Sequence, residues 1–380
     1  DAFQKSDLDK AAFTTDNPIE EMGIKQDVIA APISQMVKDC LADTGMDNKS
    51  MLKCRNMFAV GLVCWLFNRD LNIAEDFIRE KFSKKPEIAE ANIKVVRSGY
   101  DYGHNTHASV AHTYKIESKA AVPGKYMDIT GNKATAYGFI AAAEKAGLKL
   151  YLGSYPITPA TDVLHELSKH KSLGVTTVQC EDEIAGCASA IGASYAGALA
   201  VTSTSGPGIC LKSEAMNLAV IMELPLVVLD VQRGGPATGL PTKSEQTDLL
   251  QVLFGRNGES PMPVIAATSP TDCFDSAYMA AKIALEHMTP VVLLTDAFVA
   301  NGSGAWKLPK LANYPAINPP YVRPEMSETW TPYQRDPKTG VRYWAVPGTE
   351  GFTHVLGGLE KDNKTGAIST DPENHDLMTR

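Results

Sequence analysis

The order of apolar and polar positions divides the chain into two regions of different kinds. Between residues 47 and 99 the apolar positions recur at helical spacing, and Asp47 and Pro86 are residues that commonly begin helices. From residue 127 onward, short apolar runs alternate with helical patterns. Repeated β–α units of this length predict a mostly parallel sheet with helices on both faces. We therefore expect an α/β fold that is preceded by a mainly helical region.

The alternating region predicts strands at residues 148–153, 175–179, 199–204, 226–231, 264–267 and 291–295. The helices predicted between them cover residues 134–146, 160–170, 184–196, 209–222 and 271–287. In the first region, helices are expected from residue 50 to 67, over 73–82, and from 87 to 98 with Gly99 as the stop signal. Residues 1–24 are expected to form a loop and residues 100–126 an extended linker.

Three parts follow from these patterns. Residues 1–115 form the helical region and its linker, and residues 127–300 form the α/β domain. Residues 301–380, which are rich in proline and tryptophan, are expected to be irregular and to wrap around the domain.

Composition excludes several classes of protein. The net charge of −8, without a dense basic run, argues against a nucleic-acid partner. The most apolar stretch, residues 57–67, is too short to span a bilayer, and no secretory signal pattern opens the chain. We therefore expect no membrane partner and a cytoplasmic location. The seven cysteines lack metal-binding spacing. His104, His107 and His112 cluster in the expected linker, where they fit solvated residues better than a metal site.

The most informative stretch begins at Glu183. This glutamate opens a helix of small residues and follows a predicted strand, at the edge where open α/β sheets place ligands. The acidic residues 181–183 could simply complement the helix dipole. The small residues that follow favour a functional role, because they allow another backbone to approach closely. The turn Ser205–Gly208, with the sequence S-G-P-G, follows the next strand.

Two further loops are expected at the same edge. In the sequence Tyr155–Pro159, Thr158 presents a hydroxyl group, and it could at the same time be the N-cap of a helix with Pro159 at its first position. Arg233 ends a strand and precedes a glycine-rich loop. Arginine binds carboxylates through two parallel hydrogen bonds, but a structural salt bridge is the alternative role for this residue.

In this order, Y-P-I-T-P, the helix that begins at Glu183, S-G-P-G and Q-R-G-G-P-A-T-G-L-P-T resemble the α subunit of 2-oxoacid:ferredoxin oxidoreductases, most closely the 2-oxoglutarate type. Residues 57–103 resemble the end of the γ domain that is often fused ahead of that subunit. The start of the γ domain and the domain that normally follows the α module are expected to be missing from this sequence.

The resemblance implies roles for individual residues. Glu183 would contact N1′ of the thiamine diphosphate pyrimidine and supply the proton that lets the cofactor's 4′-imino group act as a base. The residues implied to bind the cofactor are Pro156, Glu183 and Ser205. Those implied to bind the 2-oxoacid are Tyr155, Thr158 and Arg233. Lys212, Lys243 and Arg256 are candidates for a second substrate carboxylate, and the sequence does not choose among them.

The resemblance also implies partners. The sequence shows no G-D-G followed by a downstream asparagine and no cysteine set for an iron–sulfur cluster. A β subunit would therefore supply the Mg²⁺–diphosphate half of the thiamine site and a [4Fe–4S] cluster. The complex would convert a 2-oxoacid and coenzyme A to acyl-CoA, CO₂ and reduced ferredoxin. The alternatives are an acetolactate-synthase-like decarboxylase or carboligase subunit and a noncatalytic subunit that positions a partner.

Overall fold

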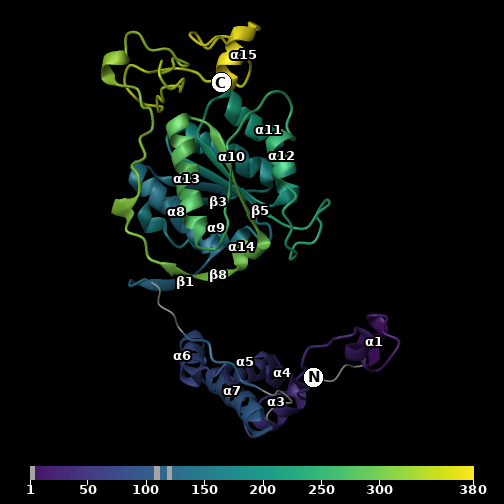
Figure 1. The fold of residues 1–380 in the computed structure, drawn as a ribbon. Helices are drawn as coiled ribbons and strands as arrows, with labels where there is room; N and C mark the ends of the chain where they lie inside the picture. The colour runs from purple at the N-terminus through teal and green to yellow at the C-terminus, as the bar shows by residue number, and fades with distance from the viewer. Residues whose placement is uncertain (1–4, 107–111, 118–121) are drawn as a thin grey trace. The chain divides into compact units, whose positions relative to one another are not determined.

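The computed structural model describes residues 5–106, 112–117 and 122–380, and it divides into two compact units, Asp1–Val122 and Pro123–Arg380 (Figure 1). All regular structure described in the first unit is helical. Its helices are α1 (Lys5–Lys10), α2 (Pro18–Glu21), α3 (Ile33–Leu41), α4 (Asn48–Lys53), α5 (Arg55–Leu66), α6 (Leu71–Lys81) and α7 (Pro86–Thr106).

Several helix boundaries in this unit differ from the predictions. The helix expected from residue 50 to 67 is interrupted at Cys54, and α1 and α2 lie in the stretch that was expected to be a loop. Asp47 caps α4 as predicted, because its side chain accepts a hydrogen bond from the backbone N–H of Ser50. His104 belongs to α7 rather than to a linker, and His107 lies outside the described residues.

Gly99 does not end α7, and its role is in packing. A Cβ atom built on Gly99 would lie 2.0 Å from the carbonyl oxygen of Phe58 on α5. One built on Gly61 of α5 would lie 1.9 Å from the carbonyl oxygen of Val96 on α7. The two helices therefore touch through their backbones at paired glycines. A glycine in mid-helix here allows close approach instead of signalling a stop.

The second unit is built on a six-stranded parallel sheet with the order β3–β2–β4–β5–β7–β6. The strands are β2 (Leu150–Ser154), β3 (Val175–Gln179), β4 (Leu199–Thr204), β5 (Leu226–Gln232), β6 (Val264–Ala266) and β7 (Pro290–Asp296). The helices are α8 (Gly131–Ala146), α9 (Thr161–Leu167), α10 (Glu183–Tyr195), α11 (Gly206–Ile221), α12 (Leu249–Phe254), α13 (Asp272–His287) and α14 (Ala297–Asn301).

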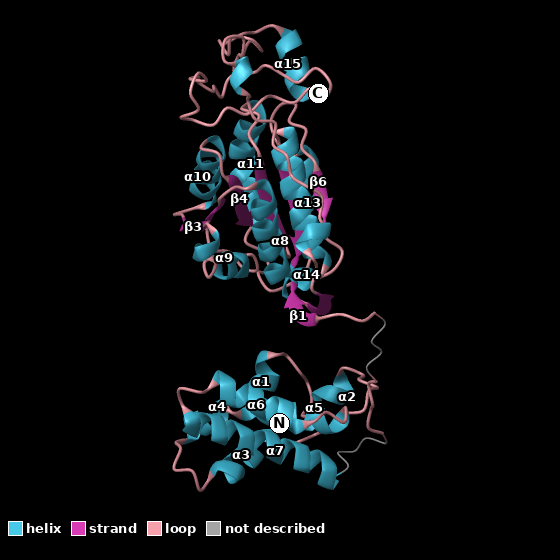
Figure 2. Ribbon diagram, turned by 90° about the vertical axis from the view of Figure 1, so that its left-hand side faces the viewer, coloured by secondary structure: helices cyan, strands magenta, loops and turns pink. Residues whose placement is uncertain are grey.

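The predicted α/β fold is confirmed, since the helices cover both faces of this sheet (Figure 2). Along β5, Val227 and Leu229 pack against the layer that contains α8, α9 and α13. Leu226 and Val228 point to the opposite layer, which contains α10, α11 and α12. Side chains on both faces are buried, so the strands read as continuous apolar runs in the sequence.

Several elements of this unit were not predicted. The strand β1 (Tyr126–Thr130) pairs antiparallel with β8 (Ser303–Lys307) and forms a separate two-stranded sheet. The helix α12 lies inside the stretch that was read only as a glycine-rich loop. A last helix, α15 (Pro372–Thr379), follows the largely irregular residues 308–371.

The irregular segment is held on the domain by the buried cations Arg342 and Lys361 and by the half-buried Arg335. Arg342 donates to the carbonyl oxygen of Glu223 (3.0 Å), just beyond the end of α11. Arg335 pairs with the Glu223 carboxylate, and Lys361 donates to the carbonyl oxygen of Ile221. Positive side chains at a helix C-terminus satisfy its free carbonyls and complement its dipole. No helix in the described part of the chain is long and apolar enough to cross a membrane.

The paired glycines of α5 and α7 generate a test. Gly99→Ala should destabilise the first unit by roughly 1–3 kcal/mol, because the added methyl group meets a backbone carbonyl that no side-chain rotation can move. Hydrogen exchange of the α5 and α7 amides would report this as faster local opening. The matched variant His104→Ala changes an exposed residue of the same helix and should leave the exchange rates unchanged. Equal exchange rates in Gly99→Ala and the unaltered chain would show that α5 and α7 can move apart without a loss of stability.

Candidate functional site

The site lies at the carboxyl edge of the sheet, between β2 and β4. The chain passes from β2 to β3 on one side and then returns to β4 on the other side of β2, so the strand order reverses at this point. Open α/β sheets bind ligands at such reversals. Ser154 at the end of β2 donates a hydrogen bond to the carbonyl oxygen of Ser203 on β4 (2.9 Å), which ties the two strand ends together.

Glu183 is the first residue of α10 and is 6% exposed. The helix start is capped by its neighbour, since a carboxylate oxygen of Asp182 accepts a hydrogen bond from the backbone N–H of Ala185 (2.7 Å). Glu183 is therefore not needed as the cap, and its side chain is directed elsewhere. The acidic triplet thus contains one capping residue and one buried carboxylate with a different role.

Gly208 provides the space for that carboxylate. A Cβ atom on Gly208 would lie 2.8 Å from Cγ of Glu183, 3.0 Å from its Oε1 and 2.0 Å from Oγ1 of Thr204. The Glu183 side chain therefore lies against the first turn of α11, as well as at the start of its own helix. Both helix N-termini carry partial positive charge, which favours a carboxylate between them.

Small residues bring α10 close to β2. A Cβ atom on Gly153 would lie 2.2 Å from Oγ of Ser189 and 2.6 Å from the carbonyl oxygen of Gly186. Any larger residue at position 153 would push α10, and with it Glu183, away from the sheet. This contact explains the small-residue composition of the helix.

Ser205 stands at the N-cap position of α11 and is fully buried. Its hydroxyl oxygen has no hydrogen-bond partner among the described residues. Buried hydroxyl groups are nearly always paired, so an unpaired one at a strand end beside Glu183 is a suitable contact for a polar ligand atom.

Arg233 joins two loops. Its Nη1 donates to the carbonyl oxygen of Thr158 (2.6 Å) and its Nη2 to that of Thr238 (2.8 Å). The side chain is 6% exposed, and its Nε has no partner in the described part of the chain. The structure thus brings Arg233 and Thr158 together as expected. Arg233 forms no ion pair with any described residue, so the salt-bridge alternative finds no support.

The loop after β2 presents Tyr155 and Thr158 as exposed residues and Pro156 as a half-buried one. Helix α9 begins at Thr161 with Ala160 as its N-cap, so the prediction of Thr158 as an N-cap is wrong. The loop is anchored from beneath by the buried Asn132, whose side-chain amide donates to the carbonyl oxygen of Pro159 (3.0 Å). Sequence analysis did not identify this anchor.

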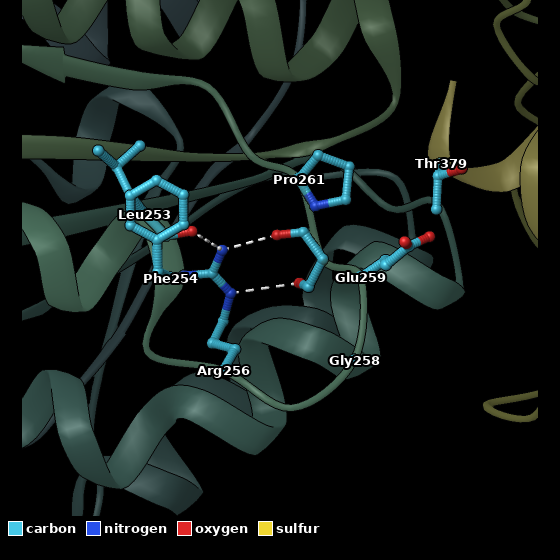
Figure 3. Close-up of a pocket in the computed structure, with 8 residues that line it drawn as sticks. Leu253, Phe254, Arg256, Gly258, Glu259, Pro261 and Thr379 are labelled. Carbon is cyan, nitrogen blue, oxygen red and sulfur yellow. Dashed lines mark hydrogen bonds between the residues drawn. The ribbon is translucent and has the colours of Figure 1, made fainter.

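The three basic candidates for a second substrate carboxylate lie in different surroundings. Lys212 is fully buried and bonded within the fold. Arg256 lines a pocket of about 400 Å³ beside α12, where it donates to the backbone and side-chain oxygens of Ser260 (Figure 3). Lys243 is exposed, and its backbone is bonded to Gly234, next to Arg233. Of these three candidates, Lys243 alone lies in the loop that follows Arg233, and its side chain is exposed.

A pair of carboxyl groups lies beneath the S-G-P-G turn. Asp230 is fully buried at the end of β5, in register with Thr204 of β4. The carboxylate of Asp248, at the N-cap position of α12, lies 2.9 Å from the position that a Cβ atom on Gly206 would take. Burial, together with the charge of Asp248, raises the pKa of Asp230 well above its ordinary value of 3.8. Neither carboxyl oxygen of Asp230 has a hydrogen-bond partner among the described residues, so its protonated form is favoured by burial and by the nearby charge of Asp248.

The sequence belongs with a recognisable group of proteins. It matches the family described as pyruvate flavodoxin/ferredoxin oxidoreductase, thiamine diphosphate-binding, over residues 141–370. Residues 8–102 match the family described as pyruvate ferredoxin/flavodoxin oxidoreductase.

Individual relatives agree with these matches. The 2-oxoglutarate oxidoreductase subunit KorA of Mycobacterium tuberculosis is 51% identical over 381 residues, covering 100% of this chain and 58% of that protein. The 2-oxoglutarate synthase subunit KorA of Methanocaldococcus jannaschii is 36% identical over 251 residues, covering 66% of this chain and 65% of that protein.

A solved structure is also similar. It is the 2-oxoglutarate:ferredoxin oxidoreductase from Magnetococcus marinus with 2-oxoglutarate, coenzyme A and succinyl-CoA bound. It matches with a TM-score of 0.78 and 34% identity, covering 93% of this chain and 58% of that one. The chain therefore spans less than two thirds of the length of each of these relatives.

The carboxyl pair predicts how stability depends on pH. Because the pKa of Asp230 is raised in the folded state, the folded chain holds a proton that the unfolded chain releases above about pH 4. The free energy of unfolding should therefore fall as the pH rises through the folded-state pKa, by at most about 1.4 kcal/mol per pH unit for one proton. Asp230→Asn is neutral at every pH and should remove this component of the slope.

Urea unfolding between about pH 5 and pH 9 would measure the two slopes. Asp128→Asn, which alters an exposed carboxyl group on β1, is the control and should leave the slope unchanged. Parallel curves for Asp230→Asn and the unaltered chain would contradict a raised pKa of Asp230 in the folded chain.

Proposed function

The chain belongs to the pyruvate flavodoxin/ferredoxin oxidoreductase family of thiamine diphosphate-binding proteins, and from this premise we propose that it acts as the α subunit of a 2-oxoacid:ferredoxin oxidoreductase of the 2-oxoglutarate type. The complex would decarboxylate the 2-oxoacid oxidatively, transfer the acyl group to coenzyme A and pass the electrons to ferredoxin. The observation that carries the proposal is the buried Glu183 carboxylate, seated against Gly208 where the strand order reverses.

The residues at this edge fit the pyrimidine half of thiamine diphosphate. When bound, the cofactor supplies the carbanion that attacks the carbonyl carbon of a 2-oxoacid. Glu183 would hold a proton on its carboxyl group and donate it to N1′ of the pyrimidine ring. Ser205, whose buried hydroxyl lacks a partner among the described residues, would bind a polar atom of the ring. Pro156 would contact the face of the ring from the loop after β2.

The 2-oxoacid would bind between the loops that Arg233 joins. The exposed side chains of Tyr155 and Thr158 and the free Nε of Arg233 are the groups available there for its carboxylate and carbonyl oxygens. Two nitrogens of the guanidinium are already bonded to the loop carbonyls, so the third lies in a fixed direction. The names of the relatives favour 2-oxoglutarate as the substrate.

A β subunit would supply the Mg²⁺–diphosphate half of the site and the [4Fe–4S] cluster that passes electrons to ferredoxin. The surface next to the site supports such a partner. Helix α12 has the sequence LLQVLF, but among its apolar residues only Val252 is buried, while Leu250 is 69% and Phe254 is 77% exposed. A contiguous apolar surface of this kind marks a protein interface. We place the complex in the cytoplasm, in keeping with seven unpaired cysteines.

Replacing the acid tests the proposal directly. Glu183→Gln in the assembled complex should retain thiamine diphosphate but lose activity by roughly 10²–10⁴-fold, because the amide has a similar shape and cannot supply the proton. Viologen reduction with 2-oxoglutarate would measure activity, and calorimetry would measure cofactor binding. Glu181→Gln alters an exposed carboxylate two residues away and should be fully active. Activity of Glu183→Gln above about a tenth of the unaltered level would instead indicate a noncatalytic subunit.

A second variant tests substrate binding. Arg233→Lys should lower kcat/KM for the 2-oxoacid about 10–150-fold, mainly through KM, with little effect on the KM for coenzyme A, because an ammonium group cannot hold both loops and the substrate. The control is Arg256→Lys. Arg256 also donates to a backbone oxygen, but it lies beside α12, so this variant should leave the KM for the 2-oxoacid unchanged. An unaltered KM in Arg233→Lys, together with a lowered melting temperature, would restrict Arg233 to a structural role.

A further inference from the structure

Lys212 lies directly beneath the start of α10. It belongs to α11 and its side chain is fully buried. Its Nζ donates hydrogen bonds to the backbone carbonyl oxygen of Glu183 and to Oγ1 of Thr202, each at 2.9 Å. A single ammonium group therefore connects the first residue of α10, the strand β4 and the helix α11.

Burying this group is costly for the fold. Burial lowers the pKa of Lys212, and no carboxylate lies within ion-pair distance of its Nζ among the described residues. The charges and titratable groups that face it come from the start of α10 and the loop before it, namely Glu183, Asp182, Cys187 and Cys180. The next turn of α11 continues into the apolar core with Ala215 and Met216, both of which are buried. An apolar side chain would fill the same space without the desolvation penalty, so stability alone does not account for a lysine here.

The rest of α10 shows what the lysine adds. The helix consists mainly of small residues, and the side chain of Asp182 caps its N-terminus. At its far end, Ser194 donates to the carbonyl oxygen of Pro225 (2.6 Å), which fixes that end against the turn before β5. Lys212 makes the corresponding bond at the end that carries Glu183. Without it, the first turn would be held to the sheet by contacts between small side chains.

We propose that Lys212 is a positioning residue that fixes Glu183 for catalysis by holding its backbone carbonyl against β4 and α11. The inference rests on the proposed role of Glu183. With its backbone fixed at this point, the carboxylate stays in the space that Gly208 leaves and cannot slide along α11. A general acid must stay within hydrogen-bond reach of the atom that it protonates, so a small displacement of this turn would reduce turnover while leaving the binding of the 2-oxoacid largely intact.

The same geometry excludes the earlier candidate role. The Nζ of Lys212 is fully enclosed and bonded on two sides within the fold, so it cannot reach a second carboxylate of the substrate. Lys212 therefore acts through Glu183 rather than on the 2-oxoacid.

A double-mutant cycle in the assembled complex tests this inference. Lys212→Met, which is similar in length and apolar, should lower kcat roughly 10–100-fold, with the KM for 2-oxoglutarate within about threefold of the unaltered value. Added to Glu183→Gln, it should cause no further loss, because a residue that acts through Glu183 has nothing left to position. Lys149→Met replaces an exposed lysine of the same unit and should leave kcat unchanged.

Hydrogen exchange of the chain provides a readout that is independent of catalysis. In Lys212→Met, the amides at the start of α10 should exchange faster, while those near Ser194 should not change. If Lys212→Met does not fold, Lys212→Gln, whose shorter side chain keeps a donor, serves in the same cycle.

The outcomes separate the inference from the proposed function. Full activity of Lys212→Met beside an inactive Glu183→Gln would overturn the role of Lys212 and leave the proposed function standing. Additive losses in the double variant would also overturn it, since they would show a general effect on the fold. An active Glu183→Gln would remove the proposed function and, with it, the basis for a positioning role.

Discussion

The site depends on the burial of one carboxylate at the junction of two helices and two strands. Glu183 can occupy that place because Gly208 leaves room for its side chain and Gly153 lets α10 lie directly against β2. The cost of burying the group is offset by the positive ends of α10 and α11, which meet there. The small residues of this region are thus required by the position of the Glu183 side chain. The sheet and its helical layers provide a rigid support for that side chain.

Buried polar groups fix the loops at this edge of the sheet. Arg233 holds the loop after β2 to the glycine-rich loop, and Asn132 supports the first of these from α8. Near the turn that contains Gly206, the buried Asp230 lies close to Asp248 at the start of α12. Arg233 and Asn132 both bond to backbone oxygens within the fold rather than to solvent. The proposed substrate and cofactor groups are therefore presented from a preorganised frame, which is the main structural means of lowering a reaction barrier.

Sequence patterns predicted the sheet because its strands are continuous apolar runs, and they predicted the loops of the site because strand ends in a parallel sheet meet at one edge. They failed where the cause lies in tertiary contacts. Gly99 was predicted to end a helix, but a glycine is needed there because the backbone of Phe58 lies against it. The sequence of β1, YMDIT, is too short and mixed to predict a strand without its partner β8. Lys212 was a candidate for binding the substrate because the sequence does not show that a lysine is buried. Asp230 is different, since a carboxyl group within the apolar run LVVLDVQ could have been recognised as buried from the sequence.

The central claim is that this chain provides one half of a shared thiamine site, with Glu183 as its acid. Calorimetric titration of thiamine diphosphate and Mg²⁺ into the chain, into the proposed β subunit and into their mixture tests it most directly. The account predicts tight, Mg²⁺-dependent binding in the mixture, and neither protein alone should reach that affinity. Binding to the isolated chain with the affinity of the mixture would contradict a shared site. Undiminished binding to the isolated β subunit would equally show that Glu183 and its surroundings are not part of it.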